Sequence, residues 1–208
     1  MVGANTDTKQ KLIETTLDLI WKNSYGAVSV DDICKNAQVK KGSFYYFFPT
    51  KDDLAVAALD AAATLAKAAR EEAVSTGKSA VERLHQYAEF TYQAQVQAAE
   101  KYGHVCGCPA TSIGSELACH DSRIRESADV LRRQHLEYYE EIVKDFVAEG
   151  LLPKDTDIKE KSQKVNCYLT GLLTNARIDN NLKTLRQDLT SGVLQILGVG
   201  DRKAGNIK

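Results

Sequence analysis

The feature of this sequence that most limits its fold is how rarely anything interrupts a helix. Its 208 residues contain three prolines and 13 glycines, and the stretches between them are rich in Ala, Leu, Glu and Lys. A chain of β-strands needs far more turn residues than this. We therefore predict an all-α fold. The length suits one compact domain, or a small domain followed by a larger one.

Apolar residues at helical spacing predict nine helices. The first ends near residues 24–26, a short second helix follows Ser29 as its N-cap, and a third runs from about 40 to 47, where Pro49 stops it. Together these three predict a helix-turn-helix arrangement. The later helices are expected at about 51–73, 79–101, 109–119, 122–149, 157–179 and 184–197.

Charge and hydropathy exclude several classes of protein. The net charge of −1 creates no field that would draw the whole molecule to nucleic acid, so any DNA binding must be local. No apolar run is long enough to cross a membrane, and the first residues have no apolar signal region, which predicts a cytoplasmic protein without a membrane partner. Five cysteines in such a chain predict free thiols.

Positive charge is concentrated in the segment from Lys35 to Lys51, which has four lysines and no acidic residue. Ser43, Tyr45 and Tyr46 lie among these lysines and carry hydroxyl groups that can bind phosphates or base edges. A glycine at position 42 allows the backbone to approach a phosphate closely. This combination is typical of a recognition helix that enters the major groove of DNA. The alternative is a helical hairpin with a solvated lysine face.

The stretch VSVDDICKNAQVKKGSFYYFFPTKDDL resembles the N-terminal DNA-binding domain of the TetR family of transcriptional regulators. The resemblance covers about residues 9–60, and the helical remainder agrees in length and layout. It implies a DNA-binding domain at 1–50, a ligand-binding and dimerisation domain at 51–200, and a frayed tail at 201–208. It also implies a homodimer that represses transcription from a palindromic double-stranded operator until a small-molecule effector binds.

The resemblance assigns roles to particular residues of the second and third helices. Lys41, Ser43 and Tyr46 match positions that contact base edges. Ser29, Gly42, Tyr45 and Lys51 match positions that contact the DNA backbone, and Lys40 is an additional phosphate contact. Two residues depart from the family pattern. Asp31 stands where some members have a base-contacting arginine, and Phe47 replaces a polar residue. Phe44, Phe47 and Phe48 are expected in the core.

Apolar stripes in the last two helices predict the dimer contact, because a single helix-turn-helix binds only one half-site. The expected contact residues are Leu169, Leu172, Leu173, Leu189, Val193 and Leu197. The alternative is that these stripes pack inside one chain. Cys34 and Cys167 lie in apolar stripes and are expected in the core.

The effector is expected among the central helices, where aromatic side chains with polar tips are frequent. The candidates are Tyr92, Tyr102, Tyr138 and Tyr168, with Tyr87, Phe90 and Tyr139 as further walls. Most of these side chains are expected to pack in the core.

Three cysteines and two histidines between residues 104 and 120 form a second candidate region. Cys108 and Cys119 match cysteines of a TetR subset with a Gly-Cys-Pro step, some of which respond to oxidants or electrophiles; Cys106 lies beside them, and Arg177 is a candidate positive neighbour. Packing is the favoured interpretation of these thiols, thiol sensing the second and a metal site the third. The sequence has no phosphate-binding loop or other catalytic motif, so we expect neither an enzyme nor a cofactor.

Overall fold

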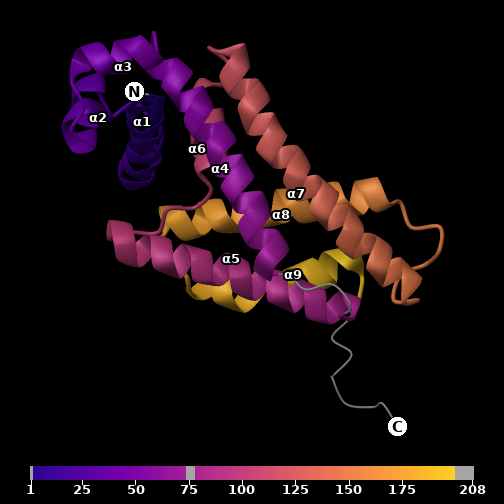
Figure 1. Ribbon diagram of the computed structural model, residues 1–208. Helices are drawn as coiled ribbons and strands as arrows, with labels where there is room; N and C mark the ends of the chain where they lie inside the picture. The colour runs from indigo at the N-terminus through magenta and orange to yellow at the C-terminus, as the bar shows by residue number, and fades with distance from the viewer. Residues whose placement is uncertain (1, 74–77, 200–208) are drawn as a thin grey trace. The chain divides into compact units, whose positions relative to one another are not determined.

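The computed structural model describes residues 2–73 and 78–199, and all nine elements in these ranges are α-helices. Their bounds are α1 Val2–Lys22, α2 Val30–Ala37, α3 Lys41–Phe47, α4 Lys51–Ala73, α5 Ala80–Tyr102, α6 Pro109–Leu117, α7 Ser122–Ala148, α8 Ile158–Ile178 and α9 Lys183–Leu197 (Figure 1). The predicted all-α fold is confirmed. The tail predicted at 201–208 lies outside the described residues.

The helix ends follow from local sequence chemistry. Ser29 caps α2 by accepting a hydrogen bond from the Asp32 N–H, while the Asp32 carboxylate accepts one from the Ser29 N–H. Ser79 and Glu82 form the same reciprocal pair at the start of α5. Such pairs satisfy N–H groups that have no partner within the helix. The positions predicted for these two helix starts are therefore confirmed.

The contacts divide the chain into two compact units. The first contains the residues up to 67 and residues 108–132, and the second contains residues 68–107 and those from 133 onward. The boundary between the units falls within α4 and within α7, so each of these helices contributes residues to both units. The functional boundary predicted at residue 50 stays a prediction, because a compact unit is defined by packing rather than by function.

The first unit is built around the N-terminal helices, which lie together in Figure 1. Ile33 of α2, Phe44 of α3 and Leu54 of α4 are completely buried with Leu12 of α1. Phe48 is buried as predicted, whereas Phe47 is only half-buried. A second cluster in the same unit joins α1 and α4 to α6 and the first turns of α7.

The second unit has a core formed by α5, α7, α8 and α9, with α8 and α9 side by side (Figure 1). This core corrects the predicted dimer contact. Of the six expected contact residues, Leu173 is only partly buried. The other five are buried inside the single chain: Leu169, Leu172, Leu189, Val193 and Leu197. Helical periodicity identifies a buried stripe without showing which chain covers it.

The two cysteines that were expected in the core differ in their exposure. Cys34 is buried as predicted, but Cys167 is exposed, because it lies between the buried positions 165 and 169 on the outer side of α8. Across the described ranges, no helix is long and apolar enough to span a lipid bilayer.

Candidate nucleic-acid interface and effector region

The third helix is positioned by a tight turn and by its own aromatic residues. Gln38 ends α2 in the left-handed conformation, with φ of 54°, and its N–H donates to the carbonyls of Cys34 and Lys35. Phe44 and Phe48 then fix α3 from its inner side, because both are buried against α1, α2 and α4. The outer side carries Tyr45, which is 49% exposed, and Tyr46, which is 72% exposed. Two tyrosines that water reaches this freely are available for a partner.

Both lysines at the start of α3 are exposed, and one of them is paired. Lys41 Nζ lies 2.8 Å from Asp31 Oδ1 across the turn, and the hydrogen bond to Asp31 raises the pKa of the Lys41 ammonium. Lys40 precedes the helix as its N-cap without a side-chain cap bond. Asp31, which departs from the family pattern, thus pairs with one of the residues predicted to contact DNA.

Gly42 and Ser43, both in the first turn of α3, differ in how far the protein covers them. A Cβ atom built on Gly42 would have no neighbour within 4 Å, so nothing inside the protein requires glycine there. Ser43 is half-buried, and its N–H donates to the Lys40 carbonyl at 2.9 Å. Since glycine weakens a helix, its presence at this open position favours an external reason, such as a closely approaching phosphate.

Two residues expected to contact the DNA backbone have partners within the chain. The Ser29 hydroxyl is engaged with Asp32 in the cap of α2. Lys51 is half-buried, lies over the ring of Tyr25, and donates to the carbonyls of Tyr25 and Val28 at 3.0 and 2.8 Å. Burial lowers the pKa of the Lys51 ammonium. Their contacts with DNA stay predictions, and they also hold the segment that precedes α2.

An ion-pair cluster in the first unit escaped the sequence analysis. Arg123, near the start of α7, binds the Asp121 carboxylate at 2.7 Å and also pairs with Asp53 of α4. Hydrogen bonds from Thr50 and from Arg123 lower the pKa of Asp53. The partners are 70 residues apart in sequence, so no local pattern could have revealed them. The cluster ties the beginning of α4 to the beginning of α7.

The aromatic candidates of the second unit separate into a cluster and scattered residues. Tyr87, Tyr138 and Tyr139 pack together, and the hydroxyls of Tyr87 and Tyr139 share a hydrogen bond of 2.6 Å. By contrast, Arg186 covers the ring of Tyr92 and Lys101 that of Tyr102. The hydroxyl of Tyr168 donates to the Asp188 carbonyl.

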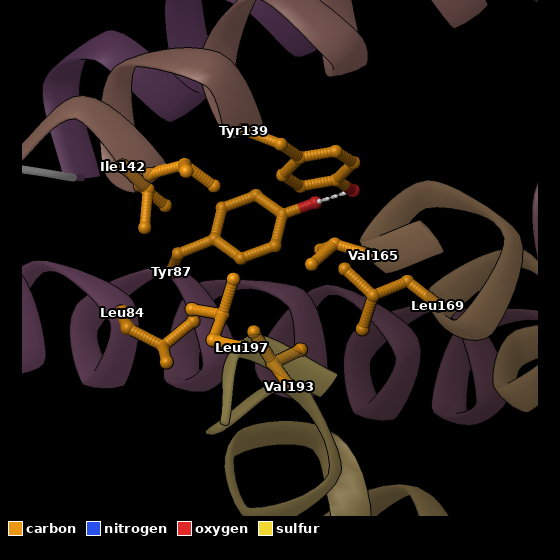
Figure 2. Close-up of a pocket in the computed structure, with 9 residues that line it drawn as sticks. Leu84, Tyr87, Tyr139, Ile142, Val165, Leu169, Val193 and Leu197 are labelled. Atoms are coloured by element: carbon orange, nitrogen blue, oxygen red, sulfur yellow. Dashed lines mark hydrogen bonds between the residues drawn. The ribbon is translucent and has the colours of Figure 1, made fainter. Parts of the chain in front are cut away.

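Beside the tyrosine pair lies a small apolar cavity, shown in Figure 2. The space between its walls holds little more than one water molecule, and these walls are Tyr87, Tyr139 and seven aliphatic side chains from α5, α7, α8 and α9. Ligand pockets are usually about 300–1,000 Å³. An effector can therefore enter this cavity only if its walls move apart.

The candidate thiols differ in environment. Cys106 is buried, and its Sγ donates to the His104 carbonyl at 3.4 Å; burial raises the pKa of this thiol although Arg177 acts against the shift. Cys108 is partly buried at the N-cap of α6, whereas Cys119 is exposed beyond its other end. The nine-residue helix α6, about 14 Å long, lies between these two, and a disulfide needs Cα atoms within about 7 Å.

A buried glutamine, Gln95, holds the backbone between Cys106 and Cys108. Gln95 accepts a hydrogen bond from the Gly107 N–H at 3.0 Å and donates one to the Gly107 carbonyl at 3.1 Å. Gly107 has a φ of +68°, and Arg177 lies against it. In the part of the chain that the structure describes, no three His, Cys, Asp or Glu side chains gather as metal ligands.

These features define a helix-turn-helix DNA-binding protein with a separate helical unit. Residues 12–58 match the description "Bacterial regulatory proteins, tetR family", and residues 80–190 match "Tetracyclin repressor-like, C-terminal domain". The chain belongs to the TetR family of transcriptional regulators.

Curated relatives agree with this assignment. The transcriptional regulator AcuR of Cereibacter sphaeroides is 32% identical over 52% of this chain and 48% of its own length. An uncharacterised HTH-type regulator of Lactococcus lactis is 28% identical over 60% of this chain and 62% of its own length. The chain thus spans about half to three fifths of these relatives. The reduced form of Escherichia coli NemR, 20% identical, has the same fold, with a TM-score of 0.77 over 93% of this chain and 98% of that one.

Proposed function

We propose that this protein is a homodimeric repressor that binds a palindromic operator through α3 of each copy and leaves it when a small-molecule effector binds the second unit. The observation that carries the proposal is the outer side of α3. Lys40, Lys41, Tyr45 and Tyr46 are exposed there, while Phe44 anchors the opposite side. A hairpin whose lysines are merely solvated would not need to expose two tyrosines.

The proposed contacts have a measurable electrostatic signature. Lys40 and Lys51 are the two lysines expected to contact phosphates in each half-site, and a dimer doubles this number. Each phosphate that a lysine neutralises contributes about 0.9 to the slope of log affinity against log salt concentration. Four such contacts predict a slope of about −3 to −4. Half-sites about 34–36 Å apart would place both helices on one face of the DNA.

For the dimer contact we propose the exposed side of α8 in place of its buried stripe. Cys167, Gly171, Thr174 and Ile178 recur there at intervals of four, three and four residues, and all are exposed in the single chain. Ile178 is 74% exposed, and the position of Gly171 is open to close approach by another helix. An exposed isoleucine beside small residues supports packing against a second copy.

Effector binding would act through the helices that the two units share. α4 joins the helix-turn-helix to the second unit, and α7 contributes to both units. A ligand that prefers one arrangement of α4 and α7 would change the separation of the two α3 helices. Modification of Cys108 or Cys119 is an alternative trigger. Location in the cytoplasm and absence of catalysis, both expected from the sequence, remain predictions.

The direct test is binding of the purified protein to its own promoter region, followed by fluorescence anisotropy at several salt concentrations. The double variant Lys41→Ala/Tyr46→Ala should lose at least about tenfold in affinity, because a good base contact is worth about 1–3 kcal/mol. Lys159→Ala removes an exposed lysine from α8 and serves as the control. Unchanged affinity of the double variant would refute the assignment of α3.

A further inference from the structure

The second unit contains a buried positive charge that no acidic side chain of the described residues neutralises. Arg70, near the end of α4, is only 6% exposed. Its guanidinium lies over the ring of Tyr138, 5.0 Å from the centroid. Among the described residues no carboxylate pairs with it. A buried charge is costly unless a partner of opposite sign compensates it.

Two acidic residues of α7 beyond Tyr138 are already engaged with another arginine. Arg83 of α5 pairs with Asp145 and lies 3.9 Å from Glu141, and both acids belong to α7. They therefore compensate Arg83. Arg70 is left with the ring of Tyr138 as its electron-rich neighbour, and an aromatic face carries no net charge.

Two polar groups without partners lie one turn apart on α7, and one of them belongs to the tyrosine that Arg70 contacts. The Tyr138 hydroxyl and the Gln134 Oε1 atom are buried and make no hydrogen bond in the described part of the chain. His135 lies on the same turn of α7, and burial together with the charge of Arg70 lowers its pKa to about 4. A neutral imidazole and a hydroxyl can both donate hydrogen bonds, and so can a glutamine amide once its side chain has turned.

The tyrosine cluster continues from this polar group to the apolar cavity. The ring of Tyr138 lies 4.9 Å from that of Tyr87, and Tyr87 and Tyr139 form the aromatic wall of the cavity (Figure 2). A cation and unpaired donors thus adjoin an apolar space of limited volume. Once the cavity walls have moved apart, this is the complement of a small molecule that has a negatively charged head and a short hydrocarbon part.

We propose that Arg70, Gln134, His135 and Tyr138 bind the carboxylate group of a small organic acid, and that this acid is the effector. The guanidinium would form a charge-assisted pair with the carboxylate, and the hydroxyl of Tyr138 would donate to one of its oxygens. The regulatory part of this statement rests on the proposed function. The carboxylate site itself does not, because it can be measured without DNA.

Calorimetry on the full-length protein tests the site, with sodium butyrate and sodium benzoate as probes. Both should bind, and butyramide and benzamide, which lack the charge, should not. Arg70→Gln should weaken binding of the acids at least tenfold. Arg186→Gln is the matched control, since Arg186 also covers a tyrosine ring but is exposed and paired with Glu89. Equal binding to wild type and Arg70→Gln, no binding of either acid, or equally tight binding of sodium sulfate would overturn the proposal.

Thermal unfolding in sodium chloride gives a second readout that needs no ligand. If Arg70 is kept for a ligand, Arg70→Met should melt at the same or a higher temperature than wild type, because methionine removes an uncompensated charge. If Arg70 instead stabilises the fold, replacing it should lower the melting temperature. A clearly lower melting temperature for Arg70→Met would therefore refute the site.

Operator binding separates the site from the regulatory role. Butyrate or benzoate should lower the affinity of wild type for operator DNA and leave that of Arg70→Gln unchanged. Acids that bind without affecting DNA would remove the effector role and keep the site. A wild type that binds the acids but no operator would contradict the proposed function alone.

Discussion

Replacing Gly42 by alanine should move fold stability and DNA affinity in opposite directions. Gly42 is the second residue of α3, and an added Cβ would meet no atom within 4 Å. Nothing in the protein has to shift to admit the methyl group. Any loss of function in this variant must then arise from something that approaches α3 from outside.

The stability gain follows from helix propensity. Alanine is favoured over glycine in a helix by about 0.5–1 kcal/mol. For a chain of this size, each kcal/mol shifts the melting temperature by about 2–4 °C. Gly42→Ala should therefore melt about 1–4 °C above wild type in a thermal scan, with the dimer intact.

The loss of DNA affinity follows from close approach. A methyl group between the α3 backbone and a phosphate separates the two and removes a contact from each half-site. Anisotropy titrations should show weaker operator binding at every salt concentration, with a nearly unchanged salt slope, because the lost backbone contact removes no lysine charge from the DNA. Thr184→Ala is the control, because Thr184 is the exposed second residue of α9. It should add stability and leave DNA binding unchanged. A stabilised Gly42→Ala variant with wild-type affinity would refute this reasoning.

Four further outcomes are expected. Asp31→Asn should raise operator affinity and steepen its salt dependence, because the Asp31 carboxylate pairs with Lys41, which we propose to contact DNA; unchanged titrations would contradict this. Gly171→Leu should give a folded monomer in light scattering, and a persistent dimer would exclude this side of α8. Maleimide should label Cys119 in the native protein well before Cys106, as mass spectrometry can show; equal rates would contradict the burial of Cys106. Folded His135 stays neutral down to about pH 4, while the unfolded residue takes up a proton below about pH 6.5, so the free energy of unfolding should fall by roughly 3 kcal/mol across that interval, and not in His135→Gln.

Local sequence determined the helices and the outer side of α3. Ser29 with Asp32, and Ser79 with Glu82, mark helix starts that need no tertiary information, because a capping pair acts within one turn. The exposure of Tyr45 and Tyr46 beside buried Phe44 follows from helical periodicity within seven residues. The predicted DNA-contacting residues were named from the lysines and tyrosines of this segment and from its resemblance to the TetR family.

Only the tertiary structure decided which partners the remaining side chains have. An apolar stripe looks the same whether its own chain or a second copy covers it, so Leu189 and Val193 were assigned to the dimer although they lie in the core. Arg123 meets Asp53 from 70 positions away, and Arg70 lies buried without a carboxylate. Burial and charge compensation depend on residues that are distant in sequence, and the free energy of a charged side chain is set by these neighbours.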